Sequence, residues 1–356
     1  MSTHSNPTAK PGAKRSLGLM RSFRRQARAL TPFITLIVMV LFFALASEGN
    51  RFINPDNMRN ILIQAASLAI LATGVTFVLL IGEIDLSVGG IATAAAVVSC
   101  YMFVTLRFDG WICVLTGTVL GAVLGLINGV VIARVGVPSF MVTLAMQFIT
   151  NGISLFLTKG RPIFDVPEIS LALGTGEIGP VPAIVIVAAI VMILGTLLLV
   201  YTRFGRYVYM AGGNKEAAEL SGVNAKNITI AVMMISGLLA GFSGIVGSGR
   251  LGSANPDIFK ETTLDVIATV VLGGTSLFGG VGSVPNTVIG LLVFGVLKNG
   301  LNLVNIDIYI KPFITGVILL LALILNVFAL RLGQSEQEAE IKDVTKKEEA
   351  PPVGSS

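Results

Sequence analysis

Uninterrupted apolar runs restrict this chain to one kind of environment. Two of them read VPAIVIVAAIVMILGTLLLVY at residues 181–201 and FITGVILLLALILNVFAL at residues 313–330. A helix that crosses a lipid bilayer needs about 20 mostly apolar residues, and both runs are close to that length. Charged residues make up 13% of the chain, about half the share found in soluble domains. The sequence therefore predicts an all-α polytopic membrane protein.

The apolar segments give an expected order of about ten transmembrane helices, with a range of eight to ten. The eighth is too short to cross as a straight helix, and we expect it to be broken, re-entrant or buried in protein. We expect a transmembrane domain over residues 32–331, flanked by a basic tail (1–31) and a polar tail (332–356), both disordered because they cannot bury a core. The predicted segments are 32–47, 60–81, 86–104, 111–133, 139–158, 182–201, 228–247, 263–274, 284–300 and 310–330.

Basic residues set the expected orientation. Residues 14–28 read KRSLGLMRSFRRQAR and precede the first apolar segment. Cytoplasmic segments of membrane proteins are rich in lysine and arginine, so we expect both termini and the polar loop 202–227 inside the cell. This clustering explains the net charge of +5 without nucleic acid as a partner. The beginning of the chain also resembles a signal peptide cleaved after residue 46; we favour a retained helix, because the preceding tail is long and many spans follow.

Several kinds of chemistry are excluded or disfavoured by residues that the chain lacks. Its only histidine, His4, excludes a histidine-based metal site or a Ser-His hydrolase, and we expect no metal and no cofactor. It has no Gly-x-x-x-x-Gly-Lys-Ser/Thr phosphate loop, so it cannot be an ATPase itself. No cluster of nucleophile, base or metal ligands favours a membrane enzyme. Cys100 and Cys113 flank a short loop, where a disulfide is an alternative to the favoured role in packing.

Two acidic residues interrupt the apolar sequence LLIGEIDLSVGG at residues 79–90. A charge near the bilayer centre costs about 2.5–3.5 kcal/mol, so it needs a partner or a function. We favour a structural role for Asp85, whose carboxylate would accept free N–H groups at the start of the following helix, with Ser87 nearby. Two alternatives stay open for Glu83 and Asp85, namely a polar wall of a substrate path and a proton or sodium site.

A weak internal repeat relates residues 125–144 to residues 295–319. Both contain Asn-Gly, a loop and a proline that opens the next apolar helix, and each follows a glycine-rich break, at 82–90 and at 273–282. Duplicated halves with interrupted helices are typical of transporters, whose substrate path lies between the halves. Asn128 and Asn299 hold equivalent places in the repeat. The candidate path or gate residues are therefore Glu83, Asp85, Ser87, Asn128, Gly273, Gly274 and Asn299.

The polar loop 202–227 contains a short predicted helix. Its sequence NKEAAELSG places helix formers between Asn214, which suits an N-cap, and Gly222, which suits a C-terminal stop. A short helix of this kind could lie in a socket on a cytoplasmic partner and transmit its motion. From the residues alone, a solvated connector is an equal alternative.

The same loop resembles the cytoplasmic coupling segment of bacterial ABC importer permeases, whose hallmark is Glu-Ala-Ala, three residues, Gly. Here Glu216, Ala217 and Ala218 are followed by Gly222. GEIDLSVGG, NGVVIARVGVPSFMVTLAM and VLGGTSLFGGVGSVPNTVIG are similar to the sugar branch of that family, the ribose, xylose, arabinose and galactose type. The resemblance covers about residues 32–331. One departure is Glu83, where the family usually has glycine.

The resemblance implies the permease subunit of an ATP-driven importer in the bacterial inner membrane, moving a pentose, a hexose or a related polyol. Its partners would be a separate cytoplasmic ATP-binding subunit, a periplasmic or extracellular sugar-binding protein, membrane lipid and a second permease, expected to be an identical chain. The coupling residues would be Asn214, Glu216, Ala217, Ala218, Ser221 and Gly222. A self-sufficient secondary transporter driven by an ion gradient is the alternative, although it would not need the loop 202–227.

Overall fold

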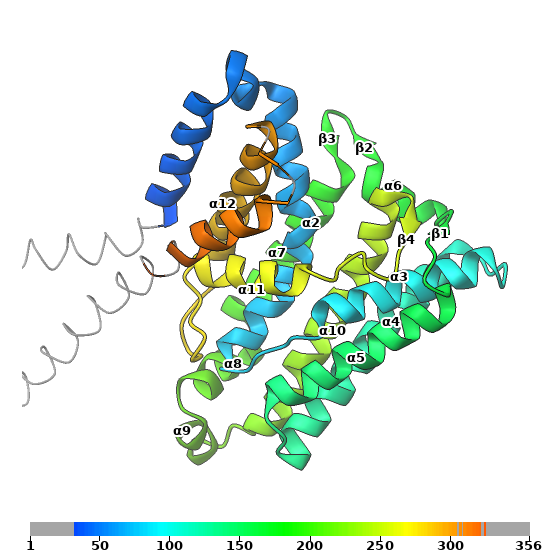
Figure 1. Ribbon diagram of the computed structural model, residues 1–356. Coiled ribbons are helices and arrows are strands. Elements are labelled where there is room, and N and C mark those ends of the chain that lie inside the picture. Colours follow the sequence, from blue (N-terminus) through cyan, green and yellow to red (C-terminus); the bar gives the residue numbers. More distant parts are fainter. Residues whose placement is uncertain (1–31, 305, 308, 322–323, 325–356) are drawn as a thin grey trace, which may run out of the picture.

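The computed structural model of the chain describes residues 32–304, 306–307, 309–321 and 324, which form a bundle of helices (Figure 1). Within these residues, six helical segments are long and apolar enough to cross a membrane. They are α2 (Pro55–Leu80), α4 (Gly110–Val130) with the π-helical turn η2 (Val131–Val135), α5 (Ser139–Thr158), α7 (Ala183–Tyr201), α10 (Ala225–Leu251) and α12 (Val284–Leu303).

Four shorter apolar helices complete this set in the described part of the chain: Pro32–Ala46, α3 (Val88–Val104), α11 (Thr262–Leu272) and Lys311–Leu321. Each of the ten predicted apolar segments overlaps one of these ten helices. A mostly helical membrane fold is confirmed, and so is the shortness of the eighth segment, since α11 has 11 residues. The number of true crossings and the N-in/C-in orientation stay predictions, and the two tails lie outside the described residues.

Local capping explains where the helices differ from their predicted bounds. The helix α2 begins at Pro55 because proline suits the first helical position and the Asn54 side chain accepts a hydrogen bond from the Asp56 N–H at 3.0 Å. The helix α10 begins three residues before its predicted start because Asn224 Oδ1 accepts from Asn227 N at 3.0 Å. It continues to Leu251 and ends at Gly252, which has a left-handed backbone conformation.

The centre of the bundle is formed by α2, α3 and α10 (Figure 1). The helix α3 is buried along most of its length, from Val88 to Cys100. Contact between α4 and α10 occurs backbone to backbone. A Cβ atom on Gly121 would lie 2.3 Å from the Gly237 carbonyl oxygen, and one on Gly125 would lie 2.3 Å from the Met233 carbonyl oxygen. Small residues of this kind let membrane helices approach closely, and we call this contact the α4–α10 seam.

The two cysteines are free and buried in the structure, so the packing role is confirmed and the alternative disulfide is not formed. Cys100 lies in a small apolar cluster with Ala96, Val97, Val166 and Ala254. By contrast, the outer surfaces of α4, α5 and α7 expose many large apolar side chains, as expected for contact with lipid or with another membrane chain. These include Trp111, Leu115, Phe140, Phe148, Phe156, Ile190, Ile193 and Leu194.

The two ends of the bundle contain short elements, of which the sequence analysis predicted only α9. At one end lie α6 (Glu168–Thr175), the strand pair β1 (Ile163–Phe164) with β4 (Ser253–Ala254), and the hairpin β2 (Glu177–Ile178) with β3 (Val181–Pro182). At the other end lie α8 (Arg203–Gly213) and α9 (Lys215–Leu220), as Figure 1 shows. A short 3-10 helix, η1 (Glu48–Ile53), precedes α2.

Candidate functional site

A buried polar cluster fills the break between α2 and α3. Asp85 is 1% exposed, and its Oδ1 accepts hydrogen bonds from the Ser87 N–H at 2.9 Å and the Ser87 hydroxyl at 2.6 Å. Its Oδ2 accepts from the Ser236 hydroxyl of α10 at 3.1 Å, and Asn128 Nδ2 of α4 donates to Ser87 Oγ at 3.0 Å. We call Asp85, Ser87, Asn128 and Ser236 the Asp85 cluster. These hydrogen bonds connect the break to two membrane-spanning helices, α4 and α10.

The start of α3 is capped from other helices. The Gly89 N–H donates to Thr263 Oγ1 at 3.0 Å and the Gly90 N–H donates to Gln147 Oε1 at 2.9 Å. Asp85 itself accepts one backbone N–H, that of Ser87, immediately before the helix begins. The predicted cap is therefore shared: Asp85 orders the turn, while α11 and α5 supply the acceptors for the first helical N–H groups.

The structure brings three of the predicted path residues together, namely Asp85, Ser87 and Asn128, but places Asn299 elsewhere. Asn299 Nδ2 donates to Asn57 Oδ1 at 2.8 Å, near the start of α2, whereas the Asp85 cluster lies beyond the other end of that helix. Equivalent places in the sequence repeat thus do not give Asn128 and Asn299 a common site. Ser236 was missed because nothing distinguishes it from other serines in a small-residue helix.

The two glycine-rich breaks meet each other. The Gly280 N–H donates to the Leu80 carbonyl oxygen at 2.9 Å, and a Cβ atom on Gly82 would lie 3.2 Å from the Phe278 carbonyl oxygen. Gly273 and Gly274, the other predicted gate residues, end α11 at the start of the second break; Gly274 has a φ of +91°. The breaks at 82–90 and 273–282 therefore share one contact region.

The unpredicted helix α8 joins that contact region. A Cβ atom on Gly212 would lie 1.7 Å from the Leu80 carbonyl oxygen and 2.8 Å from the Gly280 nitrogen, so only glycine fits there. The Tyr209 hydroxyl donates to the Gly282 carbonyl oxygen at 2.9 Å. Burial raises the pKa of the Tyr209 phenol, which keeps the hydroxyl protonated as a donor. We call residues 80–82, 212–213 and 278–280 the glycine junction.

The predicted helix in the polar loop is confirmed as α9 (Lys215–Leu220), with its predicted caps. Asn214 Oδ1 accepts from the Ala217 N–H at 2.9 Å, and Gly222 has a φ of +82°. The Ser221 hydroxyl donates to the Ala217 carbonyl oxygen at 2.9 Å. Ala218 is buried against the bundle, whereas Glu216, Glu219 and Leu220 are exposed, Leu220 at 91%. The exposed face of α9 therefore includes the Leu220 side chain, which no other part of the described chain covers.

An ion pair links this helix to the first break. Lys215 Nζ lies 2.6 Å from Glu83 Oε1, and the Glu83 side chain is only 12% exposed while that of Lys215 is 53% exposed. No local sequence pattern indicates this contact, because the two residues are 132 positions apart.

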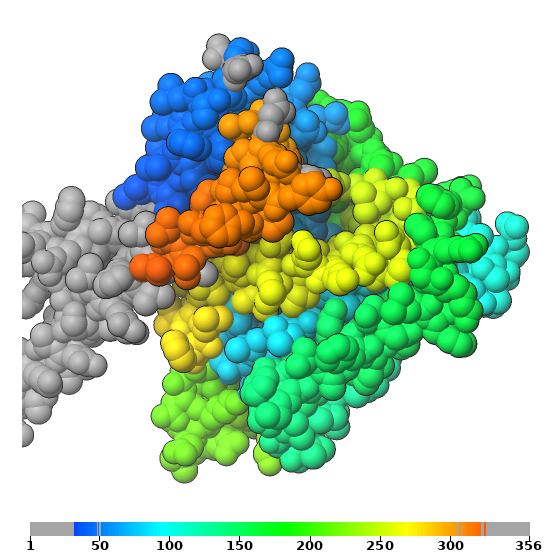
Figure 2. All heavy atoms as spheres, in the orientation of Figure 1, coloured from blue at the N-terminus to red at the C-terminus, as the bar shows by residue number. Residues whose placement is uncertain are grey.

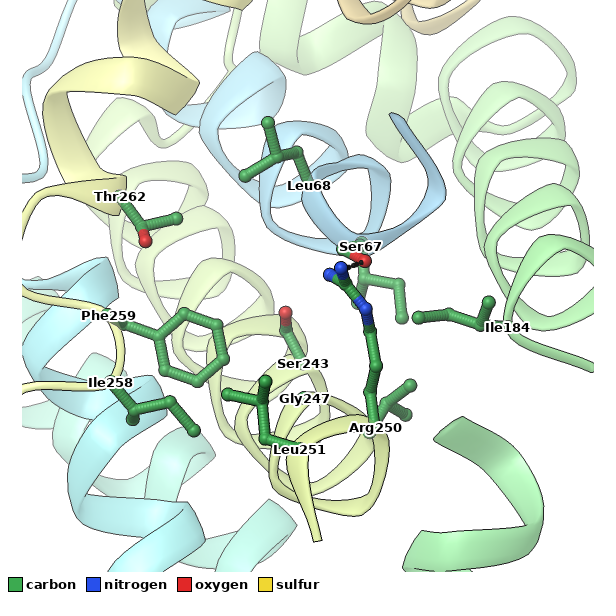
Figure 3. Close-up of a pocket in the computed structure, with 12 residues that line it drawn as sticks. Ser67, Leu68, Ile184, Ser243, Gly247, Arg250, Leu251, Ile258, Phe259 and Thr262 are labelled. Atoms are coloured by element: carbon green, nitrogen blue, oxygen red, sulfur yellow. Dashed lines mark hydrogen bonds between the residues drawn. The ribbon is translucent and has the colours of Figure 1, made fainter. Parts of the chain in front are cut away.

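A cavity of about 150 Å³ lies between α2, α7, α10 and the segment that enters α11 (Figure 3). The Arg250 guanidinium extends into it and donates to Ser67 Oγ at 2.7 Å, and the Phe259 ring lines another side. The hydroxyls of Ser243 and Thr262 also line this space. Half of the lining is aliphatic, and its polar groups are the Arg250 guanidinium and the hydroxyls of Ser67, Ser243 and Thr262. The described residues contain no group of three or more histidine, cysteine or acidic side chains that could hold a metal ion.

Comparisons with known proteins agree with this architecture. A family model described as "Branched-chain amino acid transport system / permease component" matches residues 57–323. The ribose import permease protein RbsC of Escherichia coli K12 is 37% identical over 297 residues, which cover 82% of this chain and 92% of that protein.

Two further relatives carry other sugar names. The D-allose transport system permease protein AlsC of Escherichia coli K12 is 32% identical over 83% of this chain and 90% of its own length. The L-arabinose ABC transporter permease protein AraH of Azospirillum brasilense is 32% identical over 82% of this chain and 86% of its own length. With a family match across most of its length, this chain belongs to that family of transport-system permease components.

Proposed function

We propose that this chain is the transmembrane subunit of an ABC importer that moves a monosaccharide, a pentose or hexose, or a related polyol across the bacterial inner membrane. The observation that carries the proposal is α9, a capped and rigid helix whose outer face is exposed at the end of a membrane bundle. The names of the relatives, for ribose, D-allose and L-arabinose, support the sugar class. No comparison supports a secondary transporter.

In this proposal, ATP hydrolysis belongs to a separate cytoplasmic subunit. Two copies of the permease enclose one path, and each presents α9 to one ATPase subunit, with Glu216, Glu219 and Leu220 at the contact. This assignment places both termini and the loop 202–227 in the cytoplasm, which requires an even number of crossings. A sugar-binding protein delivers substrate to the opposite end, where α6 and the strand pairs lie.

Motion of α9 would reach the path through the glycine junction. Because α8 touches both breaks directly through Gly212 and Tyr209, a displacement of the loop 202–227 moves both of them. The Asp85 cluster is sealed from solvent in this conformation. We therefore assign Asp85 to holding the first break in shape, and not to contacting substrate.

The side chains that line the cavity in Figure 3 also support a sugar as the substrate. An aromatic ring such as Phe259 packs against the apolar face of a sugar ring, while the Arg250 guanidinium and the Ser67 hydroxyl form hydrogen bonds with sugar hydroxyls. None of these lining groups is a carboxylate. Binding of a neutral polyol therefore leaves no negatively charged protein group without a partner in the cavity.

The experiment that tests the function is purification of the tagged chain from its native membrane in mild detergent. We expect a stoichiometric ATPase to co-purify, and we expect proteoliposomes of the complex to take up sugar only with ATP and the binding protein. The variant Glu216→Arg should abolish uptake but remain in the membrane at the wild-type level. A chain that purifies alone and transports under an ion gradient would overturn the proposal.

A further inference from the structure

Glu83 occupies the turn at the end of α2. Its backbone N–H donates to the Val78 carbonyl oxygen at 3.2 Å, so the turn is continuous with the last residues of that helix. Its side chain points to Lys215, the first residue of α9, with 2.6 Å between the charged atoms. The carboxylate is mostly shielded from solvent, so this pair is less screened than an ordinary surface pair.

The residues that follow Glu83 are tied to three further helices. The Ile84 N–H donates to Ser139 Oγ of α5 at 3.2 Å, and its carbonyl oxygen accepts from Thr143 Oγ1 of the same helix at 3.3 Å. Asp85 then bonds to Ser236 of α10, and Ser87 bonds to Asn128 of α4. A displacement of Glu83 would therefore be transmitted to α4, α5 and α10 through the hydrogen bonds of the residues that follow it.

The glycine junction gives α9 only an indirect contact with this turn, through the backbone of α8. Gly213, the last residue of α8, belongs to the junction, and Asn214 separates it from Lys215. Among the residues that the structure describes, this ion pair is the one side-chain hydrogen bond or ion pair between α9 and the first break. It ties the helix itself, and not only its entry segment, to the break.

We infer that Glu83 is a positioning residue for energy coupling: its ion pair with Lys215 makes the break between α2 and α3 follow the movement of α9. This inference rests on the proposed function. It also assigns a role to the residue at which the chain departs from the Gly-Gly-Ile-Asp pattern of the sugar permeases.

The test is a charge exchange measured on the assembled importer in proteoliposomes. Glu83→Lys and Lys215→Glu each place two like charges opposite each other, and each should lower binding-protein-stimulated ATP hydrolysis and sugar uptake about fivefold or more, the size typical of coupling between sites. The double variant restores opposite charges and should recover most of both activities. The amount of ATPase that co-purifies, and the thermal midpoint of the complex, should stay at the wild-type level in Glu83→Lys.

A control separates the ion pair from docking of the loop. Lys226, in the first turn of α10, is exposed and forms no ion pair among the residues that the structure describes. Lys226→Glu makes the same charge change in the same polar segment, and adding Glu83→Lys to it should give no recovery. Recovery in the Lys215 pair alone supports the inference.

Two results would overturn it. Single variants with wild-type activity would show that the pair has no part in coupling, and a double variant no better than Lys215→Glu would show that Lys215 acts only in docking. Failure of the proposed function looks different, because the wild-type complex itself would then show no ATP hydrolysis stimulated by the binding protein.

Discussion

The two glycine-rich breaks differ in how they are held. The first, at 82–90, is fixed by side chains from α4, α5, α10 and α11, and its carboxylate is buried with three hydrogen bonds. The second, at 273–282, is held mainly by backbone contacts, such as Ser276 N–H to the Val281 carbonyl oxygen at 2.8 Å. Phe278 at its tip is 92% exposed, and Figure 2 shows this segment in gold at the surface.

This difference indicates that the two glycine-rich breaks have different roles, although their sequences are similar. A break whose buried carboxylate accepts three hydrogen bonds keeps one conformation, because each lost hydrogen bond leaves an unpaired group. The second break is rich in glycine and exposes Leu277, Phe278 and Val281, although Thr275 is buried, so it loses fewer contacts when it changes shape. We therefore expect the first break to transmit motion as a rigid piece and the second to deform.

The largest effect is expected at the glycine junction, where both breaks meet. Gly212→Val would force a side chain into the Leu80 carbonyl group, and we expect loss of uptake with a complex that is poorly folded. Gly213→Ala is the matched control, because a Cβ atom there meets nothing within 4 Å. Uptake assays and thermal unfolding in detergent check both variants; a Gly212→Val protein with normal uptake would contradict the described contact.

The second-largest effect is expected for the variant Asp85→Asn. The amide offers one acceptor oxygen in place of two carboxylate oxygens, so one buried donor from Ser87 or Ser236 is left unpaired, at a cost of about 1–3 kcal/mol. We expect a lower thermal midpoint with unchanged choice of sugar. Asp257→Asn, an exposed acidic residue, should leave the midpoint unchanged. A stable Asp85→Asn protein with altered sugar preference would instead place Asp85 in the substrate path.

A smaller change in stability should distinguish the two breaks from each other. Gly82 and Gly274 both have positive φ, of +73° and +91°, but a Cβ atom on Gly82 meets the Phe278 carbonyl oxygen at 3.2 Å while one on Gly274 meets nothing. Alanine costs about 1–2 kcal/mol for the left-handed conformation at either position. Gly82→Ala should therefore destabilise more than Gly274→Ala in thermal melts, and the reverse order would reject the rigid first break.

The smallest effect is expected at Phe278. Because its side chain is in solvent, Phe278→Ser should change stability by no more than about 0.5 kcal/mol. Phe77→Ser, at a fully buried position in α2, is the comparison and should lower stability by several kcal/mol, about 3–5 for loss of a buried aromatic ring. A large loss in Phe278→Ser would show that the second break is packed and not free.

The sequence was most informative where structure depends on neighbouring residues. The short helix α9 followed from Asn214 and Gly222, which lie within one turn of its ends. By contrast, α8 was not predicted, because its residues were assigned to the polar loop 202–227, and the reason for glycine at position 212 is a contact with Leu80 far away in the sequence. The helix α6 was missed for a related reason, since it is held by packing on the end of α10 and not by a strong local pattern.

The candidate site was predictable in part. A carboxylate inside an apolar run singled out Asp85, and its neighbour Ser87 followed. The partner Ser236 and the Glu83–Lys215 pair join residues 151 and 132 positions apart, which no local pattern can report. The cavity around Arg250 arises from four separate elements, so it too required the tertiary structure.

The α4–α10 seam has a consequence for how a path could open. It joins α4 to α10, and their backbones touch at Gly121, Gly125 and Gly237. Close-packed backbones leave little room for the two helices to shift, so we expect α4 and α10 to move together. In the pair of permeases proposed above, an opening that keeps this seam intact would come from one chain tilting against the other.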